Sequence, residues 1–554
     1  MNQLLHILHY KILAVVAYRR HISMRRLAKD GMTGLVFLAF AVGSYFLTTA
    51  MIRYSLTVTH IGIFLLHEFI SMALFVFFTA VNVGNIVVAY STLYRSDEVQ
   101  YLMTKPLAPF KIYLLKTLDN FFYSSGTLIM ILLAAVFGYA NYFQLGIVTT
   151  LSILLFYFVP FLISAGLLGV LLLVLMMRLA LKIGFKPLIS GIVILYFMAY
   201  FLFFKISSPI HLVNAVLAYY PNIDQYFGEL IPLSIKLLPN NWLAMALYWL
   251  TRGDIARSLR YVSYQIGLAA GLLGLVVLVG KRFYYQTWLR LPSIRNRQNT
   301  VIQPQQSLLY HGSIAPPPAE SILKRDLLLF LREPSQMLHL GLMLFLILIF
   351  SGSLYRITLL GARNPQLQTV IYLTVFSFIL FLISALALRF IFPLISLEGN
   401  VFWKIRSAPL SSYKLMLWKL VPPFLIILLI GEILNYVASY HFHNYLVVVG
   451  TVITALVSAS MVCLNFGMGG LFAVYGEKSP IRIASSQGAT ISFLLNMVFL
   501  VLVVAVLYLP LIGFFENGNS SSGFRMLFWF LGILSLLIST GSVWLGIRSY
   551  RKDF

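Results

Sequence analysis

The sequence predicts an all-α polytopic membrane protein, and three observations support this class. Apolar residues make up 60% of the 554 residues and charged residues only 10%, whereas a soluble chain is nearer half apolar and a quarter charged. The apolar residues fall in long runs, and about 20 such residues form a helix that spans a bilayer. Basic residues gather between the runs. This composition excludes a soluble enzyme, a disordered protein and a nucleic-acid-binding protein.

Apolar length predicts about twelve spans. They cover residues 32–52, 62–90, 118–139, 144–177, 187–205, 262–280, 336–355, 367–394, 420–440, 445–475, 489–512 and 526–547. Three of them exceed one bilayer thickness, so we expect those helices to tilt, kink or protrude. Pro160 inside the fourth run predicts a kink there.

The basic residues indicate which side of the membrane each loop occupies. With both termini in the cytoplasm, the inner segments hold 30 Lys and Arg and the outer loops hold 9. Cytoplasmic loops carry such an excess. The net charge of +24 therefore indicates topology and contact with anionic lipid. Arg389 lies inside a span near its inner end and is expected to snorkel to the interface.

The chain contains an internal repeat with an offset of 303 residues. Segment 101–116 aligns with segment 404–419, with identical pairs at Pro106/Pro409, Leu107/Leu410, Lys111/Lys414, Leu114/Leu417 and Lys116/Lys419. Chance similarity between two basic loops is the alternative. Because six spans return the chain to the same side, the two six-helix repeats would be parallel and would enclose a pathway between them.

The repeat predicts two halves and a connector. The first half covers residues 1–282, a proline-rich cytoplasmic linker covers 283–320, and the second half covers 321–554. Residues 3–28 are expected to form an amphipathic helix in the cytoplasmic interface, or otherwise a frayed basic tail. The outer insert at 206–261 is rich in aromatic residues, which predicts short helices lying on the outer membrane surface.

Each half carries a short segment of the same kind on the cytoplasmic side. In the first copy Asp97 and Glu98 begin a helix-like stretch and Pro106 ends it. In the second copy Glu398 begins the stretch and Pro409 ends it. A short half-apolar helix suits docking in a groove of a partner. A surface loop that contacts lipid head groups is the alternative.

These segments carry a resemblance to a known family. The stretches LYRSDE (93–98) with LMTKPL (102–107), and SLEG (396–399) with RSAPL (406–410), resemble the coupling-helix region of ABC-2 type transporter permeases. Two further matching stretches are KRDLLLFLREP (324–334) and GMGG (467–470) with EKSP and RIASSQG up to residue 488. The duplicated arrangement resembles the large bacterial ABC exporter permeases.

The resemblance implies a permease subunit of an ATP-driven exporter that moves a hydrophobic or amphipathic cargo out of the cytoplasm or inner leaflet. It implies two copies of a separate ABC ATPase as partners, with ATP and Mg held there and no cofactor on this chain. It also implies the bacterial inner membrane, with both termini cytoplasmic. In agreement, the sequence has no G-x-x-x-x-G-K-[ST] phosphate loop, so this chain is not expected to be an enzyme. The implied ATPase-coupling residues are Asp97, Glu98, Leu102, Pro106, Lys111, Glu398, Phe402, Ile405, Pro409 and Lys414.

A second group of candidate residues lies inside the predicted spans. Glu432 is an acid in the ninth span, with Asn435 nearby. Because a charge in lipid is costly, this side chain either faces a cargo path or gate, or is a neutral acid bonded to another helix. Gly467 and Gly470 favour close helix packing or, alternatively, a hinge in that path.

Two other functions stay open beside the ATP-driven exporter. An ion-coupled secondary transporter needs ionisable groups near the membrane midplane, and Glu432 is the one clear candidate. A polytopic lipid-modifying enzyme needs clustered Asp, His or Arg, whereas the 16 acids are scattered. The pairs His6/His9 and His441/His443 lack acid or cysteine companions, so no metal site is expected.

Overall fold

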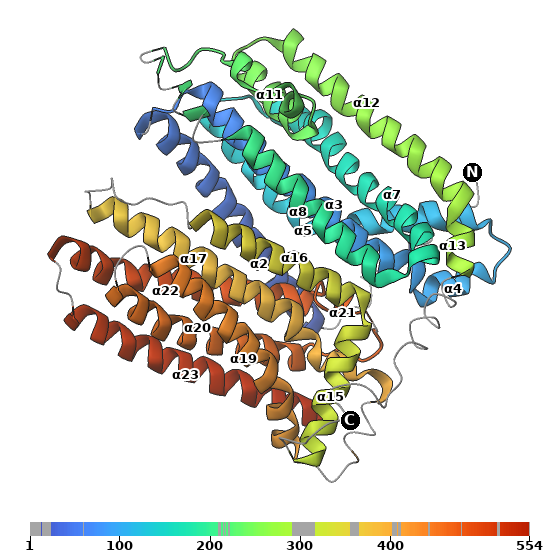
Figure 1. The fold of residues 1–554 in the computed structure, drawn as a ribbon, viewed down its shortest axis with the longest axis vertical. Helices are drawn as coiled ribbons and strands as arrows, with labels where there is room; N and C mark the ends of the chain where they lie inside the picture. The colour runs from blue at the N-terminus through green and yellow to red at the C-terminus, as the bar shows by residue number, and fades with distance from the viewer. Residues whose placement is uncertain are drawn as a thin grey trace. The chain divides into compact units, whose positions relative to one another are not determined.

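All described parts of the chain are helices and their connections, as the computed structural model shows (Figure 1). The structure describes residues 13, 24–58, 60–208, 212–213, 215–216, 218–219, 222–290, 316–354, 365–401, 407, 411–440, 444–477, 479–517 and 521–552. No strand occurs in them. The predicted all-α class is therefore confirmed. The predicted amphipathic helix at 3–28 falls almost wholly outside these residues.

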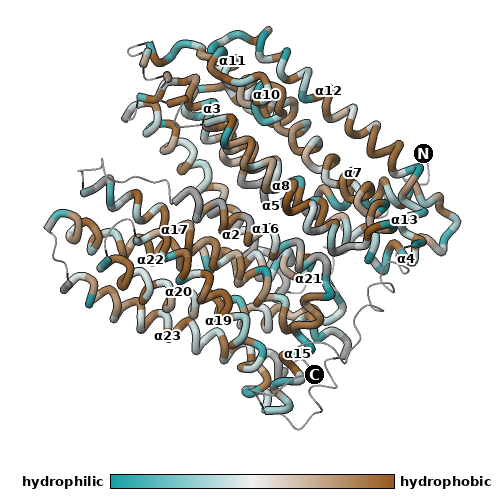
Figure 2. The backbone as a smooth tube through the Cα atoms, viewed as in Figure 1, coloured by the Kyte–Doolittle hydropathy of each residue, from teal (hydrophilic) through white to brown (hydrophobic). Residues whose placement is uncertain are grey.

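Nine helical stretches in the described residues are long and apolar enough to cross a membrane. They are Ile63–Tyr94, Ile147–Ile183, Ser190–Ser207, Ile255–Leu289, Ile371–Gly399, Ser412–Ser439, Asn444–Leu471, Gln487–Glu516 and Gly523–Ser549. Figure 2 shows long hydrophobic stretches along these helices. The chain is a polytopic membrane protein.

The chain divides into two compact units, Met1–Ile302 and Gln303–Phe554. The helices of the first unit are α2 (Met24–Arg53), η1 (Tyr54–Val58), α3 (Ile63–Ala89), η2 (Tyr90–Tyr94), α4 (Asp97–Met103), α5 (Pro109–Tyr142), α6 (Ile147–Ser152), η3 (Ile153–Phe158), α7 (Val159–Ile183), α8 (Phe185–Ser207), η4 (Gly228–Leu230), α10 (Leu233–Lys236), α11 (Pro239–Thr251), α12 (Ile255–Val279), η5 (Gly280–Tyr284) and α13 (Tyr285–Leu289).

The helices of the second unit follow the linker. They are α15 (Pro317–Arg332), α16 (Pro334–Leu354), α17 (Pro365–Phe390), η9 (Phe392–Leu394), η10 (Ser396–Val401), α19 (Ser412–Ser439), α20 (Asn444–Leu471), α21 (Pro480–Ile483), α22 (Gln487–Asn517) and α23 (Ser521–Lys552).

In the first unit, α3 packs against α5, α7 and α11, and α12 packs against α7 and α11. The π-helical turn η3 comes directly before α7, near Pro160, where the sequence predicts a kink. A π turn inside a helix is one of the recognised causes of a kink.

Helix α11 lies in the outer insert, where the sequence predicts short helices on the membrane surface. Most of this helix is buried against α3 and α12, whereas Trp242 and Trp249 stay partly exposed, and the place of the insert on the membrane surface stays a prediction. Asn240 Nδ2 donates to the Ser71 carbonyl and hydroxyl at 3.0 Å, and Asn241 Nδ2 donates to Glu68 Oε1 at 3.3 Å. These amides therefore hold α11 against α3 through hydrogen bonds between buried polar groups.

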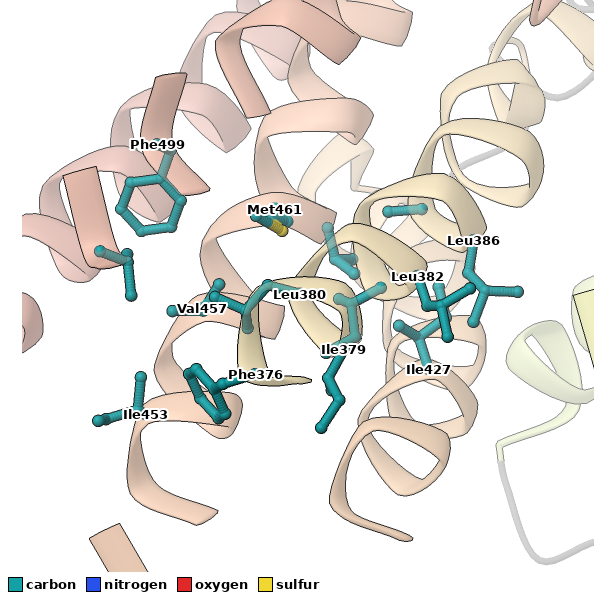
Figure 3. Close-up of a cluster of buried hydrophobic side chains, with 14 of the residues drawn as sticks. Phe376, Ile379, Leu380, Leu382, Leu386, Ile427, Ile453, Val457, Met461 and Phe499 are labelled. Carbon is teal, nitrogen blue, oxygen red and sulfur yellow. The ribbon is translucent and has the colours of Figure 1, made fainter. Parts of the chain in front are cut away.

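In the second unit, α17 and α20 form the centre of one apolar core (Figure 3). Phe376 and Leu380 of α17 lie with Val457 and Met461 of α20, and Phe499 of α22 closes one side. Each of these side chains is buried. The core therefore holds α17, α19, α20 and α22 together by close packing rather than by charge.

Glycines bring α20 and α23 into backbone contact. A Cβ added at Gly467 would lie 2.2 Å from the Ser542 carbonyl oxygen, and one at Gly470 would lie 3.1 Å from Gly546 Cα. Ser460 and Ser535 share a hydrogen bond of 2.7 Å across the same pair of helices. Small residues that let helix backbones approach are a common packing device in membranes.

This close contact gives the first prediction. Gly467→Ala should lower the free energy of unfolding by about 1–3 kcal/mol, because overpacking forces the two backbones apart. Unfolding of the purified protein in detergent, titrated with sodium dodecyl sulfate, measures the change.

Gly541→Ala is the matched control, since a Cβ at Gly541 in α23 meets nothing within 4 Å. It should keep or raise the stability, by no more than about 1 kcal/mol. An unchanged midpoint for Gly467→Ala would contradict the close contact.

Candidate functional site

The first repeated segment contains a short helix, as the sequence predicts. Ser96 is the N-cap residue of α4, and Asp97 and Glu98 occupy its first turn. Val99 is buried, whereas Asp97 and Glu98 are exposed. Thr104 ends the helix shortly before Pro106. The acids at the first turn suit the positive end of the helix dipole.

A buried lysine attaches this segment to α5. Lys116 Nζ lies 2.5 Å from Glu98 Oε2 and 3.2 Å from Asp119 Oδ2. The Lys116 side chain is only 3% exposed, whereas the Glu98 side chain is 47% exposed. A buried ammonium group needs carboxylate partners. Lys116 therefore holds the start of α4 against the membrane helix that follows it.

The second unit repeats this arrangement at the equivalent lysine. Lys419 of α19 pairs with Glu398 and, at 3.1 Å, with Asp326 Oδ2 of α15. The Lys419 and Glu398 side chains are 4% and 7% exposed. Arg325 adds contacts of 2.7 Å to Glu398 Oε1 and 2.6 Å to Asp326 Oδ1. Two cations and two carboxylates thus form one closed network.

The two carboxylates stabilise the charged form of Arg325. Burial alone would lower the pKa of Arg325, but the Glu398 and Asp326 carboxylates raise it above the usual value. The pairs Lys116–Glu98 and Lys419–Glu398 are named here the lysine ties. Each lysine tie connects a segment that precedes a membrane helix to the first turns of that helix.

The sequence prediction missed the lysines of these ties as site residues. Lys116 and Lys419 are an identical pair of the repeat, and that identity was the signal that could have found them. Arg325 and Asp326 lie in a stretch that matched the resemblance, but no charge pattern connected them to Glu398, 72 residues or more away in the chain.

The other predicted coupling residues are placed only in part. Pro106 and Lys414 are exposed, and Leu102 and Lys111 are partly exposed. Phe402, Ile405 and Pro409 lie outside the described residues. The docking role of this set stays a prediction, and so do the expected partners: two ATPase copies, lipid, and a hydrophobic or amphipathic cargo.

The second segment differs in conformation from the first. Residues Ser396–Val401 form 3-10 helix rather than α-helix, with a break at Gly399, whose φ is 59° and ψ is −152°. This backbone conformation is essentially restricted to glycine. The Ser396 hydroxyl accepts a hydrogen bond of 3.1 Å from the Val474 N–H. The tight turn at Gly399 directly follows the buried Glu398.

The predicted cargo-path residues lie mainly at helix contacts. Asn435 is fully buried and donates to Val447 O at 3.3 Å and to Thr451 Oγ1 at 3.2 Å, which connects α19 to α20. Glu432 also contacts Thr451, and its buried Oε1 lacks a partner. Gly467 and Gly470 contact α23, as described above. Their role in a cargo path stays a prediction.

Among the residues that the structure describes, no three His, Cys, Asp or Glu side chains gather in a way that could hold a metal ion. His6, His9, His441 and His443 fall outside that part of the chain.

Comparison with known proteins gives one match. Residues 22–553 match the family described as "Putative ATP-binding cassette". No curated protein and no solved structure matches the chain.

This match corrects the expectations that came from the resemblance. The assignment to ABC-2 permeases is wrong, and so is the function of a permease subunit whose ATP is hydrolysed by another chain, because an ATP-binding cassette family covers residues 22–553. The same finding contradicts the expectation that the chain is not an enzyme and that ATP and Mg lie on a partner alone. The short basic stretches and the absence of a phosphate-loop motif from the sequence were not specific enough to establish the family or the place of ATP binding.

ATP is the ligand that the family description implies, and the described residues do not fit the best-known way of holding it. A phosphate loop leaves backbone N–H groups free between a strand and a helix. Its nearest sequence counterpart begins at Gly280, which is helical with φ −61° and ψ −46°, and a Cβ there would lie 2.0 Å from the Tyr113 ring. The described part of the chain thus presents no phosphate loop, and we assign ATP to none of its residues.

The difference in burial between the two lysine ties gives the second prediction. Glu398→Gln should lower the free energy of unfolding by about 3 kcal/mol or more, because it breaks a buried pair. Glu98→Gln should cost less than about 1 kcal/mol, because Glu98 is half-exposed. Denaturant titration of the two purified variants measures both values.

Both substitutions remove one carboxylate charge, so each is the control for the other. Equal losses, or a larger loss for Glu98→Gln, would contradict the buried network around Lys419.

Proposed function

The chain belongs to the putative ATP-binding cassette family, and on that premise we propose that it is a membrane-embedded transport protein of the ATP-binding cassette class. The observation that carries the proposal is the family match over residues 22–553 of a chain with nine described helices able to cross a membrane. Transport is the activity expected of a protein that belongs to an ATP-binding cassette family and lies mostly in the membrane.

Twelve spans in two parallel six-helix repeats are the proposed architecture. The described helices α2, α5 and α16 coincide with the three predicted runs that lie outside the nine apolar stretches. The lysine ties also support the repeat, because the same pair of residue types recurs in both units. A repeated contact between equivalent elements is expected of duplicated units.

We propose the bacterial inner membrane as the location, with both termini in the cytoplasm. The excess of 30 over 9 basic residues on the two sides supports this orientation. On this orientation both lysine ties lie at the cytoplasmic ends of α5 and α19.

The lysine ties connect segments outside the membrane to membrane helices, so a displacement of such a segment would move the helix. Glu98 and Glu398 are each held by a lysine in the first turns of a long helix. Because the buried Lys419–Glu398 pair resists separation, displacing the segment Ser396–Val401 should displace α19 with it. The half-exposed Glu98 makes the connection of α4 to α5 the weaker of the two. This displacement of the helix would in turn move a hydrophobic or amphipathic cargo bound between the helices.

The third prediction tests the energy source of transport. Inside-out membrane vesicles from cells that produce the chain should accumulate an amphipathic fluorescent dye when MgATP is added. Accumulation should persist after an ionophore collapses ion gradients, and vanadate should abolish it. Vesicles from cells without the chain are the control.

Dye accumulation that needs an ion gradient but not ATP would contradict the proposal and indicate an ion-coupled transporter. Equal accumulation in vesicles without the chain would also contradict it, because transport would then belong to another protein.

The fourth prediction concerns Glu432. If this acid must ionise to hold cargo, Glu432→Gln should lower dye transport by about tenfold, since a hydrogen bond to a charged group contributes about 1.5–3 kcal/mol. Glu516→Gln removes an exposed carboxylate at the end of α22 and should leave transport unchanged. Wild-type transport by Glu432→Gln across pH 6–8 would show that Glu432 serves helix packing alone.

A further inference from the structure

Helices α16 and α17 form an antiparallel pair with a definite register. The rings of Phe350 and Phe378 pack with their centroids 4.5 Å apart. His339 lies eleven residues before Phe350, and Arg389 lies eleven residues after Phe378. Eleven residues are about three helical turns, so His339 and Arg389 return to the facing sides of the two helices. The register therefore places them opposite each other.

Both of these side chains carry a buried nitrogen without a partner. Nη1 of Arg389 and Nε2 of His339 are inaccessible to solvent and make no hydrogen bond. The two groups are also close enough for their charges to interact. Part of the Arg389 side chain is exposed near the end of α17, and snorkelling of its guanidinium to the interface stays a prediction.

An arginine in a membrane helix normally has an anionic partner. No ion pair joins Arg389 to a carboxylate among the described residues, whereas Arg325 and Lys419 of the same unit share the carboxylates of Asp326 and Glu398. A buried cation without a counter-charge destabilises the folded protein. An anion from outside the chain would remove this cost.

The positions of Arg389 and His339 along their helices indicate which kind of anion these two side chains would bind. Arg389 is the second-last residue of α17, and His339 is in the second turn of α16. Helix α15 precedes α16 directly and is amphipathic, with exposed Leu327, Leu329 and Leu331 beside basic residues. Such helices lie at the level of lipid head groups. Its Phe330 packs on Phe390, next to Arg389, with centroids 5.7 Å apart.

We propose that Arg389 and His339 form a binding site for the phosphate of an anionic phospholipid. Guanidinium groups bind phosphate oxygens through paired N–H donors, and basic sites between membrane helices at one face bind anionic head groups. His339 adds an Nε2–H donor in one tautomer of its ring. The site is independent of the transport proposal, because it needs only the α16–α17 pair.

The test is thermal unfolding of the full chain in neutral detergent with added phosphatidylglycerol, phosphatidylcholine or inorganic phosphate. Phosphatidylglycerol should raise the unfolding temperature of the wild type more than phosphatidylcholine does, because a ligand that binds the folded state stabilises it. Arg389→Gln should abolish that difference. Native mass spectrometry should show about tenfold weaker retention of phosphatidylglycerol by the variant.

Arg548→Gln is the matched control, because it removes the same charge from an exposed position in α23. It should keep the full phosphatidylglycerol effect. If Arg389→Gln does not fold, His339→Gln decides in its place, since it removes the ring nitrogen, keeps the Arg389 guanidinium, and should weaken lipid retention. Arg389→Met should equal or exceed the wild type in stability when no anionic lipid is present.

Three results would overturn the proposal. A phosphatidylglycerol effect that survives in Arg389→Gln and His339→Gln would show that the lipid binds elsewhere. An equal loss in Arg548→Gln would show a general effect of charge. The same stabilisation by inorganic phosphate would show that the site takes a free anion rather than a lipid.

Discussion

The cost of burying a lysine determines how both units place the segments before their membrane helices. Lys116 and Lys419 are almost fully buried, and an ammonium group in such a position is stable only with carboxylates beside it. In the first unit the first turn of α4 supplies Glu98, and α5 itself supplies Asp119. In the second unit the segment before Gly399 and helix α15 bring two carboxylates, those of Glu398 and Asp326, to Lys419, and Arg325 pairs with both carboxylates. Because each buried lysine needs a carboxylate beside it, the segments that carry Glu98 and Glu398 lie against the helices that carry the lysines.

Inside the units, uncharged polar side chains determine how the membrane helices pack against one another. In the first unit Asn120 donates to Asn85 Oδ1 at 2.9 Å, and Asn82 donates to the Ala165 carbonyl at 2.9 Å. In the second unit the Ser492 hydroxyl donates to Asn465 Oδ1 at 2.9 Å. Because lipid offers no hydrogen bonds, these contacts determine which helix faces meet. Apolar packing around them is less specific.

The sequence allows the membrane class and the helices to be predicted, because apolar length alone decides them. It also reveals the equivalence of Lys116 and Lys419 through the repeat. It does not reveal that α11 is buried, since aromatic residues suit an interface and a core equally well. It cannot bring Asp326 to Lys419 either, because that contact depends on how α15 packs against α19.

The assignment of function from the sequence failed for a related reason. Short stretches such as those at 324–334 and 396–410 are basic and half-apolar, and many membrane proteins need such stretches at the interface. Their resemblance to one family was therefore weak evidence, and the match of residues 22–553 to another family replaces it. The lysine ties do not depend on either assignment.

A double-mutant cycle measures the lysine ties most directly. The substitutions are Lys419→Met with Glu398→Gln, and Lys116→Met with Glu98→Gln, each alone and combined. The partly exposed i,i+4 pair Lys324–Glu320, with side chains 34% and 21% exposed, is the reference, with an expected coupling of about 0.3–0.5 kcal/mol for a helix pair of this spacing. Both ties should show a larger coupling energy than this reference, with the larger value at Lys419. Coupling energies no greater than the reference would contradict the account.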